Sequence, residues 1–208
     1  MAIKNIQLYR EQEKLIMGTI KSLVTVLDSK MPSAYTHTPY FSRLVKALAV
    51  EMNLRKKDTD SLKYASLLHD AGKINIPTEI LTKSSQLTGE EYDIIKRHPL
   101  KSAEIIKHLQ ILKPVVPIIV HHHEKYNGTG YPSRLKKGKI PIGARIMAVA
   151  DAFDAMVYGR PYKERMSVED ALEEIKKNSG TQFDPQIVKS LVKISKNKKL
   201  KKYLHLTR

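Results

Sequence analysis

The sequence predicts an all-α domain with an N-terminal helical arm. Apolar residues recur at three- and four-residue spacing through most of the chain, which is typical of amphipathic helices. No alternating apolar and polar run has the length of a strand, and no internal repeat is present. The length of 208 residues suits one domain that buries its own hydrophobic core.

The first half of the chain contains four expected helices. An apolar stripe marks the first helix, at Ile16, Ile20, Leu23, Val24 and Leu27. Residues 29–33, with Pro32, end it; the second helix follows from residue 37 to about residue 53, and the third spans residues 58–69. The fourth opens with Thr88 and Glu91, which match a capping box, and ends near residue 97. Pro99 then confines His98 to a helix end or a turn.

The second half contains four further expected helices and one prominent loop. The helices are expected at residues 118–123, 146–157, 168–177 and 185–196. Residues 127–132 form a loop by composition, because they combine asparagine, two glycines and a proline. Residues 138–142 are the candidate for a short hairpin.

Composition excludes several classes of protein. The chain has no cysteine, which rules out disulfides, thiolate chemistry and cysteine-ligated zinc. No apolar run approaches the roughly 18–20 residues that span a bilayer, and the first residues lack a signal-peptide core. We therefore expect a soluble, cytoplasmic protein without a membrane partner.

The net charge of +16 is weak evidence for a nucleic-acid partner. Much of the excess lies between Lys193 and Lys202, and no aromatic signature for stacking on RNA bases accompanies these lysines. A run of charge of this kind is usually a solvated surface. We do not expect nucleic acid as a partner.

The histidines and aspartates form a pattern that suits metal-dependent chemistry. His69 and Asp70 are adjacent at the end of an expected helix, and three consecutive histidines precede Glu124. Histidine and aspartate without cysteine suit first-row metals such as iron, manganese, zinc or cobalt. A carboxylate that bridges two ions keeps them about 3.5–4 Å apart, which is the spacing used in phosphoester hydrolysis.

The order of these residues resembles a known family. The segments are HTP (37–39), LLHDAGKI (67–74), HP (98–99), HHE (122–124), GYP (130–132), AD (150–151), RPY (160–162) and FDP (183–185). Together they resemble the HD superfamily of phosphohydrolases and, within it, the HD-GYP subfamily of bacterial phosphodiesterases that act on cyclic di-GMP. The resemblance extends from about residue 35 to residue 192, three-quarters of the chain.

The resemblance implies a metal centre and a division of the chain. The implied metal ligands are His37, His69, Asp70, His98, His122, His123 and Asp151. Asp70 would bridge two divalent ions, with iron or manganese expected and zinc, magnesium or nickel as alternatives. Residues 1–30 would form the arm, residues 31–192 the catalytic domain and residues 193–208 a lysine-rich tail.

The resemblance also implies catalytic and substrate-binding residues. Lys73, one helical turn after His69, would meet the scissile phosphate or protonate the leaving 3′ oxygen, so Asp70 and Lys73 are the expected catalytic pair. The expected substrate-binding residues are Lys73, Gly130, Tyr131, Pro132, Asp154, Arg160 and Lys163. Asp154 is equally well interpreted as a residue that only stabilises its helix.

The implied reaction is hydrolysis of the 3′–5′ phosphodiester bond of cyclic di-GMP in bacterial signalling. The product is pGpG, or GMP after a second cut. A signalling protein and a second copy bound through the N-terminal arm are further expected partners. The short segment before the core leaves no room for a receiver module, so we expect a stand-alone enzyme or an excised catalytic piece.

Three alternatives stay open at this point. Tyr40 and Phe41 replace residues common in the family, and a shifted register would put Tyr40 at the histidine position. Ser33 stands where some members have a third-metal glutamate, which favours two metals. The chain could instead be an HD hydrolase for another nucleotide, or a catalytically weak domain that binds cyclic di-GMP or a partner.

Overall fold

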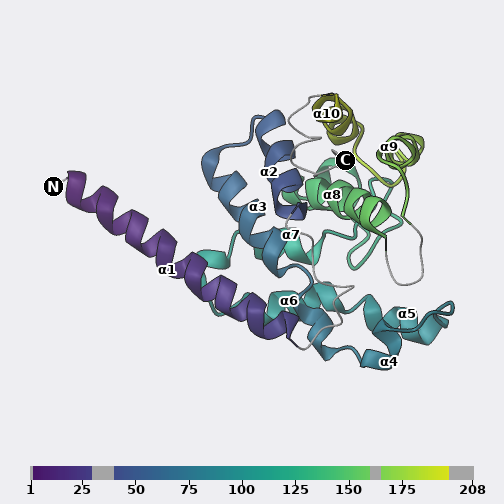
Figure 1. Cartoon of the computed structure of the whole chain (residues 1–208), viewed down its shortest axis with the longest axis horizontal. Coiled ribbons are helices and arrows are strands. Elements are labelled where there is room, and N and C mark those ends of the chain that lie inside the picture. The colour runs from purple at the N-terminus through teal and green to yellow at the C-terminus, as the bar shows by residue number, and fades with distance from the viewer. Residues whose placement is uncertain (1, 30–39, 160–164, 197–208) are drawn as a thin grey trace.

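The computed structural model describes residues 2–29, 40–159 and 165–196 (Figure 1). Within these ranges the chain is helical and contains no strand, apart from an isolated bridge between Ser179 and Phe183. The predicted all-α class is confirmed. Among the described residues, no helix combines the length and the apolar character needed to cross a membrane.

The connections between the elements differ in length, and residues 121–136 form a long one between α7 and η4. In chain order they are α1 (Ala2–Asp28), α2 (Phe41–Glu51), α3 (Lys56–Leu68), the 3-10 helix η2 (Ala71–Asn75), α4 (Thr78–Leu81), α5 (Gly89–Ile95), α6 (His98–Ile106), η3 (Gln110–Leu112), α7 (Val116–Val120), η4 (Lys137–Lys139), α8 (Ile142–Tyr158), α9 (Val168–Lys177) and α10 (Pro185–Ser195).

Helix α8 is the centre of the hydrophobic core. It contacts α2, α3, α7, α9 and α10, and Figure 1 shows it crossing the middle of the molecule. Its side chains are apolar around most of its circumference, from Ile146 and Met147 to Phe153, which are fully buried. A helix that is apolar nearly all round is stable only inside a protein. Helix α8 therefore provides a rigid wall for the site.

Helix α1 packs on the core with one half only. Ile20 and Leu27 are buried, and the helix contacts α3 and η2. Its N-terminal half extends away from the other helices in Figure 1. The amphipathic helix and the arm predicted from the sequence are thus confirmed, whereas the three-part division of the chain stays a prediction.

Several helix ends lie where the sequence patterns predict them. The capping box forms as expected: the backbone N–H of Glu91 donates to Thr88 Oγ1 (3.2 Å) and the N–H of Thr88 donates to Glu91 Oε2 (2.7 Å). Helix α9 has the expected bounds. Lys193, the start of the expected tail, lies in α10 and pairs with Glu51 (2.6 Å).

Two local expectations were wrong. Residues 138–142 do not form a hairpin: η4 leads directly into α8, with Pro141 as the residue before its first turn. His98 is not at a helix end, because it begins α6. Pro99 is tolerated there, since the N–H groups of a first helical turn have no intrahelical partner.

The turn after α3 is fastened to α6. Ser102 Oγ donates to the carbonyl of His69 (2.6 Å) and accepts from the N–H of Gly72 (2.8 Å), and all three residues are buried. A side chain on Gly72 would overlap the backbone of α6 at His98 and Ser102. The close approach of two backbones therefore requires glycine here.

We expect Ser102→Ala to lower the free energy of unfolding by about 1–3 kcal/mol, because it removes the hydrogen-bond partner of a buried N–H and of a buried carbonyl. Urea denaturation of the metal-free protein measures this change. Ser61→Ala removes a hydroxyl that bonds to a carbonyl of its own helix on the surface, and it should change stability by less than about 0.5 kcal/mol. Equal effects of the two substitutions would contradict the role of Ser102.

Candidate functional site

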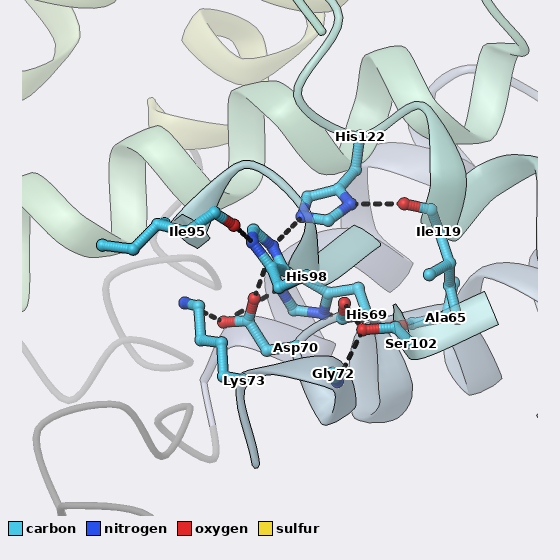
Figure 2. Close-up of polar contacts among 10 residues, drawn as sticks. All are labelled: Ala65, His69, Asp70, Gly72, Lys73, Ile95, His98, Ser102, Ile119 and His122. Atoms are coloured by element: carbon cyan, nitrogen blue, oxygen red, sulfur yellow. Dashed lines mark hydrogen bonds and ion pairs between the residues drawn. The ribbon is translucent and has the colours of Figure 1, made fainter. Parts of the chain in front are cut away.

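Three buried histidines meet at the centre of the site, each within three residues after the end of a helix (Figure 2). In each one, Nδ1 bonds to a backbone carbonyl: His69 to Ala65 (3.2 Å), His98 to Ile95 (2.7 Å) and His122 to Ile119 (2.6 Å). A carbonyl only accepts, so Nδ1 carries the hydrogen and the neutral ring presents a lone pair on Nε2. This is the tautomer that a metal ligand needs.

The helix ends explain this orientation. The last carbonyls of an α-helix have no intrahelical partner, and α3, α5 and α7 end at Leu68, Ile95 and Val120. A histidine that follows such an end can donate its Nδ1–H to a carbonyl of the last turn. The Ala65 carbonyl accepts in addition from the backbone N–H of His69 (2.9 Å). The local chain geometry therefore turns the Nε2 atoms toward a common centre.

Asp70 completes the cluster. Its Oδ1 lies 3.2 Å from His98 Nε2, and its Oδ2 lies 3.8 Å from His69 Nε2 and accepts from Lys73 Nζ (2.6 Å). The Nε2 atoms of His98 and His122 are 3.4 Å apart. One carboxylate thus faces two imidazoles and an ammonium group in a buried space.

Lys73 reaches the site by a route that differs from the expectation. The α-helix ends at Leu68 and Lys73 lies in the 3-10 helix η2, so it is not on a continuous α-helical turn with His69. Residues three apart are aligned in a 3-10 helix, which places Lys73 beside Asp70. Both side chains are nearly buried.

Burial sets the protonation of the aromatic groups. Desolvation, with the nearby His98 adding to the shift, lowers the pKa of His122 to about 4. Desolvation also holds the pKa of His123 well below its usual value, with His122 adding to the shift. Burial raises the pKa of Tyr131, so its hydroxyl keeps its proton. At neutral pH these imidazoles are therefore neutral, which is the form that binds metal ions.

The donor set fits divalent metal ions. Two groups have ligand atoms within 4.8 Å of one another, His98 with His122 and His123, and His69 with Asp70 and His122. Imidazole nitrogens and a carboxylate suit first-row transition metals. These five residues could hold metal ions, and His122 is common to both groups.

A cavity of about 420 Å³ opens above this cluster. Lys73, His98, His122 and His123 line it, together with Tyr131 and with Asp151 of α8. Some of the residues predicted for metal and some of those predicted for substrate therefore share one cavity. It is within the size range of pockets for small-molecule ligands, about 300–1,000 Å³.

Asp154 lies outside the lining of this cavity. It is buried, and its charge adds to the burial that raises the pKa of Tyr158 to about 12. Both expectations for this residue, contact with the substrate and stabilisation of its helix, stay predictions.

Glu124 holds the loop that contains the GYP segment (residues 130–132), called the GYP loop below. The sequence pattern had indicated no role for Glu124. The Glu124 carboxylate is buried and accepts from the N–H groups of Ser133 (2.7 Å) and Leu135 (3.1 Å). The ring of Tyr131 stacks on His123 with centroids 5.0 Å apart. The sequence signal for this role was an acidic residue directly after the paired histidines. The sequence did not show which groups it binds, because these are backbone N–H groups further along the loop.

Gly130 and Pro132 shape the same loop. A side chain on Gly130 would overlap the backbone of Glu124 and Lys125, so glycine is needed for this close approach. The peptide bond between Tyr131 and Pro132 is cis. Neither Gly130 nor Pro132 lines the cavity itself.

Several predicted positions lie outside the described residues or away from the site. His37, Arg160 and Lys163 fall outside the ranges that the structure describes. Tyr40, the residue of the alternative register, stacks on Tyr158 with centroids 5.5 Å apart and does not line the cavity. His121 also lies outside the lining, with Nδ1 3.6 Å from Glu124 Oε1.

Several known proteins are similar to this chain in sequence and in fold. A family model described as HD domain matches residues 21–187. A cyclic di-GMP phosphodiesterase of Thermotoga maritima is 35% identical over 192 residues, covering 91% of this chain and 52% of that protein. A 3′3′-cGAMP-specific phosphodiesterase of Vibrio cholerae is 31% identical over 194 residues, covering 92% and 37%.

A solved structure supports the fold. The crystal structure of a cyclic GMP-AMP-specific phosphodiesterase of Vibrio cholerae matches with a TM-score of 0.67 at 23% identity, covering 88% of this chain and 49% of that one. The chain spans about half the length of the Thermotoga relative. These similarities agree with the resemblance found in the sequence.

We expect Glu124→Gln to loosen the GYP loop, because an amide nitrogen cannot accept the hydrogen bond that a carboxylate oxygen accepts. Hydrogen exchange at the amides of Ser133 and Leu135 should become about tenfold to a hundredfold faster, in line with the loss of a hydrogen bond to a charged group.

Glu104→Gln is the matched control. Glu104 pairs with Lys101 on the surface, and exposed pairs of this kind contribute little stability. Unchanged exchange at Ser133 and Leu135 in the Glu124 variant would show that other contacts hold the loop.

Proposed function

Because the chain belongs to the HD domain family, we propose that it is a metal-dependent phosphodiesterase that hydrolyses cyclic di-GMP. The observation that carries the proposal is the buried cluster of His69, Asp70, His98, His122 and His123 at the base of a cavity. The relatives named for cyclic di-GMP and cGAMP support the substrate class. The expected product is pGpG, and GMP follows if the second bond is also cut.

We propose two divalent ions, iron or manganese, as the cofactors, with zinc, magnesium and nickel as alternatives. When bound, such ions supply the positive charge that polarises a phosphodiester and acidifies water. The two ligand groups would hold them, and Asp70, whose two oxygens face different histidines, has the position of a bridging ligand. Asp151 and His37 remain expected ligands.

Lys73 and Tyr131 would act on the substrate directly. The Lys73 ammonium group lines the cavity beside Asp70, where it can pair with the scissile phosphate and give a proton to the leaving 3′ oxygen. Tyr131 keeps its hydroxyl proton and can donate a hydrogen bond to a phosphate oxygen or pack on a guanine base. Arg160 and Lys163 remain expected phosphate ligands.

The gathering of His69, His98, His122 and His123 beside Asp70 does not favour a catalytically weak binding domain. A signalling partner and a cytoplasmic location remain expectations, as does the absence of a nucleic-acid partner. We propose that a second copy binds through α1. Leu8 and Leu15, 55% and 72% exposed, lie seven residues apart, which is two helical turns, on the half of α1 that extends from the core.

Hydrolysis of cyclic di-GMP by protein loaded anaerobically with Fe(II) or Mn(II) tests the activity, with products separated by chromatography. We expect turnover that Asp70→Ala abolishes and that Lys73→Ala slows by about 10²–10⁴-fold. Lys63→Ala, on an exposed part of α3, is the control and should keep full activity.

The possible failures have different meanings. Tight binding of cyclic di-GMP without turnover would replace the enzyme with a receptor domain. Neither binding nor turnover would point to another nucleotide as the substrate.

The dimer is tested by sedimentation velocity. We expect Leu15→Glu to shift the protein from dimer to monomer, because a charge would be buried between two α1 helices. Leu109→Glu, at an exposed leucine outside α1, should leave the dimer intact. A wild-type protein that sediments as a monomer would rule the dimer out.

A further inference from the structure

A second hollow adjoins the main cavity. Its volume is about 240 Å³, and it lies between α8, α9 and the segment that leads to α10. Ala152, Ala155 and Gln182 line both hollows, so only small side chains of α8 and one amide lie at the junction. A molecule whose phosphate lies in the main cavity could extend into the second hollow.

The second hollow has one apolar and one polar side. Met156 and Phe183 provide buried apolar surface, and Glu174, Asn178 and Gln182 provide half-buried polar groups. Asn178 Nδ2 donates to Glu174 Oε1 (2.9 Å) and to the Glu174 carbonyl (2.9 Å), which fixes the Glu174 carboxylate. Among the described residues, Glu174 Oε2 and the side-chain amide of Gln182 have no hydrogen-bond partner.

We propose that this second hollow binds one guanine base of the substrate and selects guanine over adenine; this inference rests on the proposed function. The volume is below that of pockets for whole drug-sized ligands, about 300–1,000 Å³, and suits one purine ring. The apolar side chains of Met156 and Phe183 suit the faces of the ring. The polar groups of Glu174 and Gln182 suit its edge.

The hydrogen-bonding edge explains the preference for guanine. Guanine presents N1–H and N2–H donors side by side, and a carboxylate accepts from both. The Gln182 amide can donate to guanine O6. Adenine presents an unprotonated N1 instead, whose lone pair would face the carboxylate of Glu174. A matched bidentate contact discriminates between bases by about tenfold to a hundredfold.

Three substrates separate base recognition from catalysis. They are cyclic di-GMP, cyclic di-AMP and bis(p-nitrophenyl) phosphate, which is a phosphodiester without a base. The variants are Glu174→Gln, which keeps the shape of the side chain, and Glu174→Ala. Glu173→Gln is the matched control, since Glu173 is exposed and pairs with Lys176 on the same helix.

We expect the wild type to prefer cyclic di-GMP to cyclic di-AMP. The Glu174 variants should lower kcat/KM for cyclic di-GMP by about tenfold to a hundredfold, leave hydrolysis of the base-free diester unchanged and bring the two dinucleotides closer together. Glu173→Gln should behave as the wild type.

An unchanged ratio of guanine to adenine substrates in both Glu174 variants would overturn the base subsite while leaving the phosphodiesterase intact. A wild type that hydrolyses none of the three substrates would refute the proposed function instead. In that case equilibrium binding of the two dinucleotides to the wild type and Glu174→Gln decides the subsite, because equal affinities would reject it.

Discussion

A neutral imidazole has one nitrogen that donates and one that accepts, and this constraint organises the centre of the molecule. Three histidines donate an Nδ1–H hydrogen bond to the carbonyls of Ala65, Ile95 and Ile119, which leaves the lone pair of each ring on Nε2. The three carbonyls come from the ends of α3, α5 and α7. The site therefore depends on where these helices stop, because each histidine lies within three residues after the end of its helix.

Burial makes this arrangement suitable for cations. Removing imidazoles from water favours their neutral form, which is why the pKa of His122 falls to about 4. The carboxylate of Asp70 is buried with the ammonium group of Lys73, so neither charge is left uncompensated. The centre can therefore accept positive charge without first releasing protons from its histidines.

Hydrogen bonds from buried side chains hold the walls of the cavity in place. Ser102 ties the turn at Gly72 to α6, and Glu124 ties the GYP loop through two backbone N–H groups. Helix α8 supplies Asp151 together with small alanines that leave room beside it. Rigid supports of this kind keep reactive groups within the narrow tolerances that catalysis needs.

The sequence by itself determined the helical class, the capping box at Thr88, the bounds of α9 and the set of histidines and aspartates around the cavity. These features are local, since helical periodicity, capping and short motifs depend on residues close together in the chain. Only the tertiary structure decided that α6 begins at His98, that Glu124 holds the loop, that Asp154 lies outside the lining of the cavity and that Glu174 faces a second hollow. Each of these depends on contacts between segments distant in the chain, such as Ser102 with His69, and no local pattern specifies such contacts.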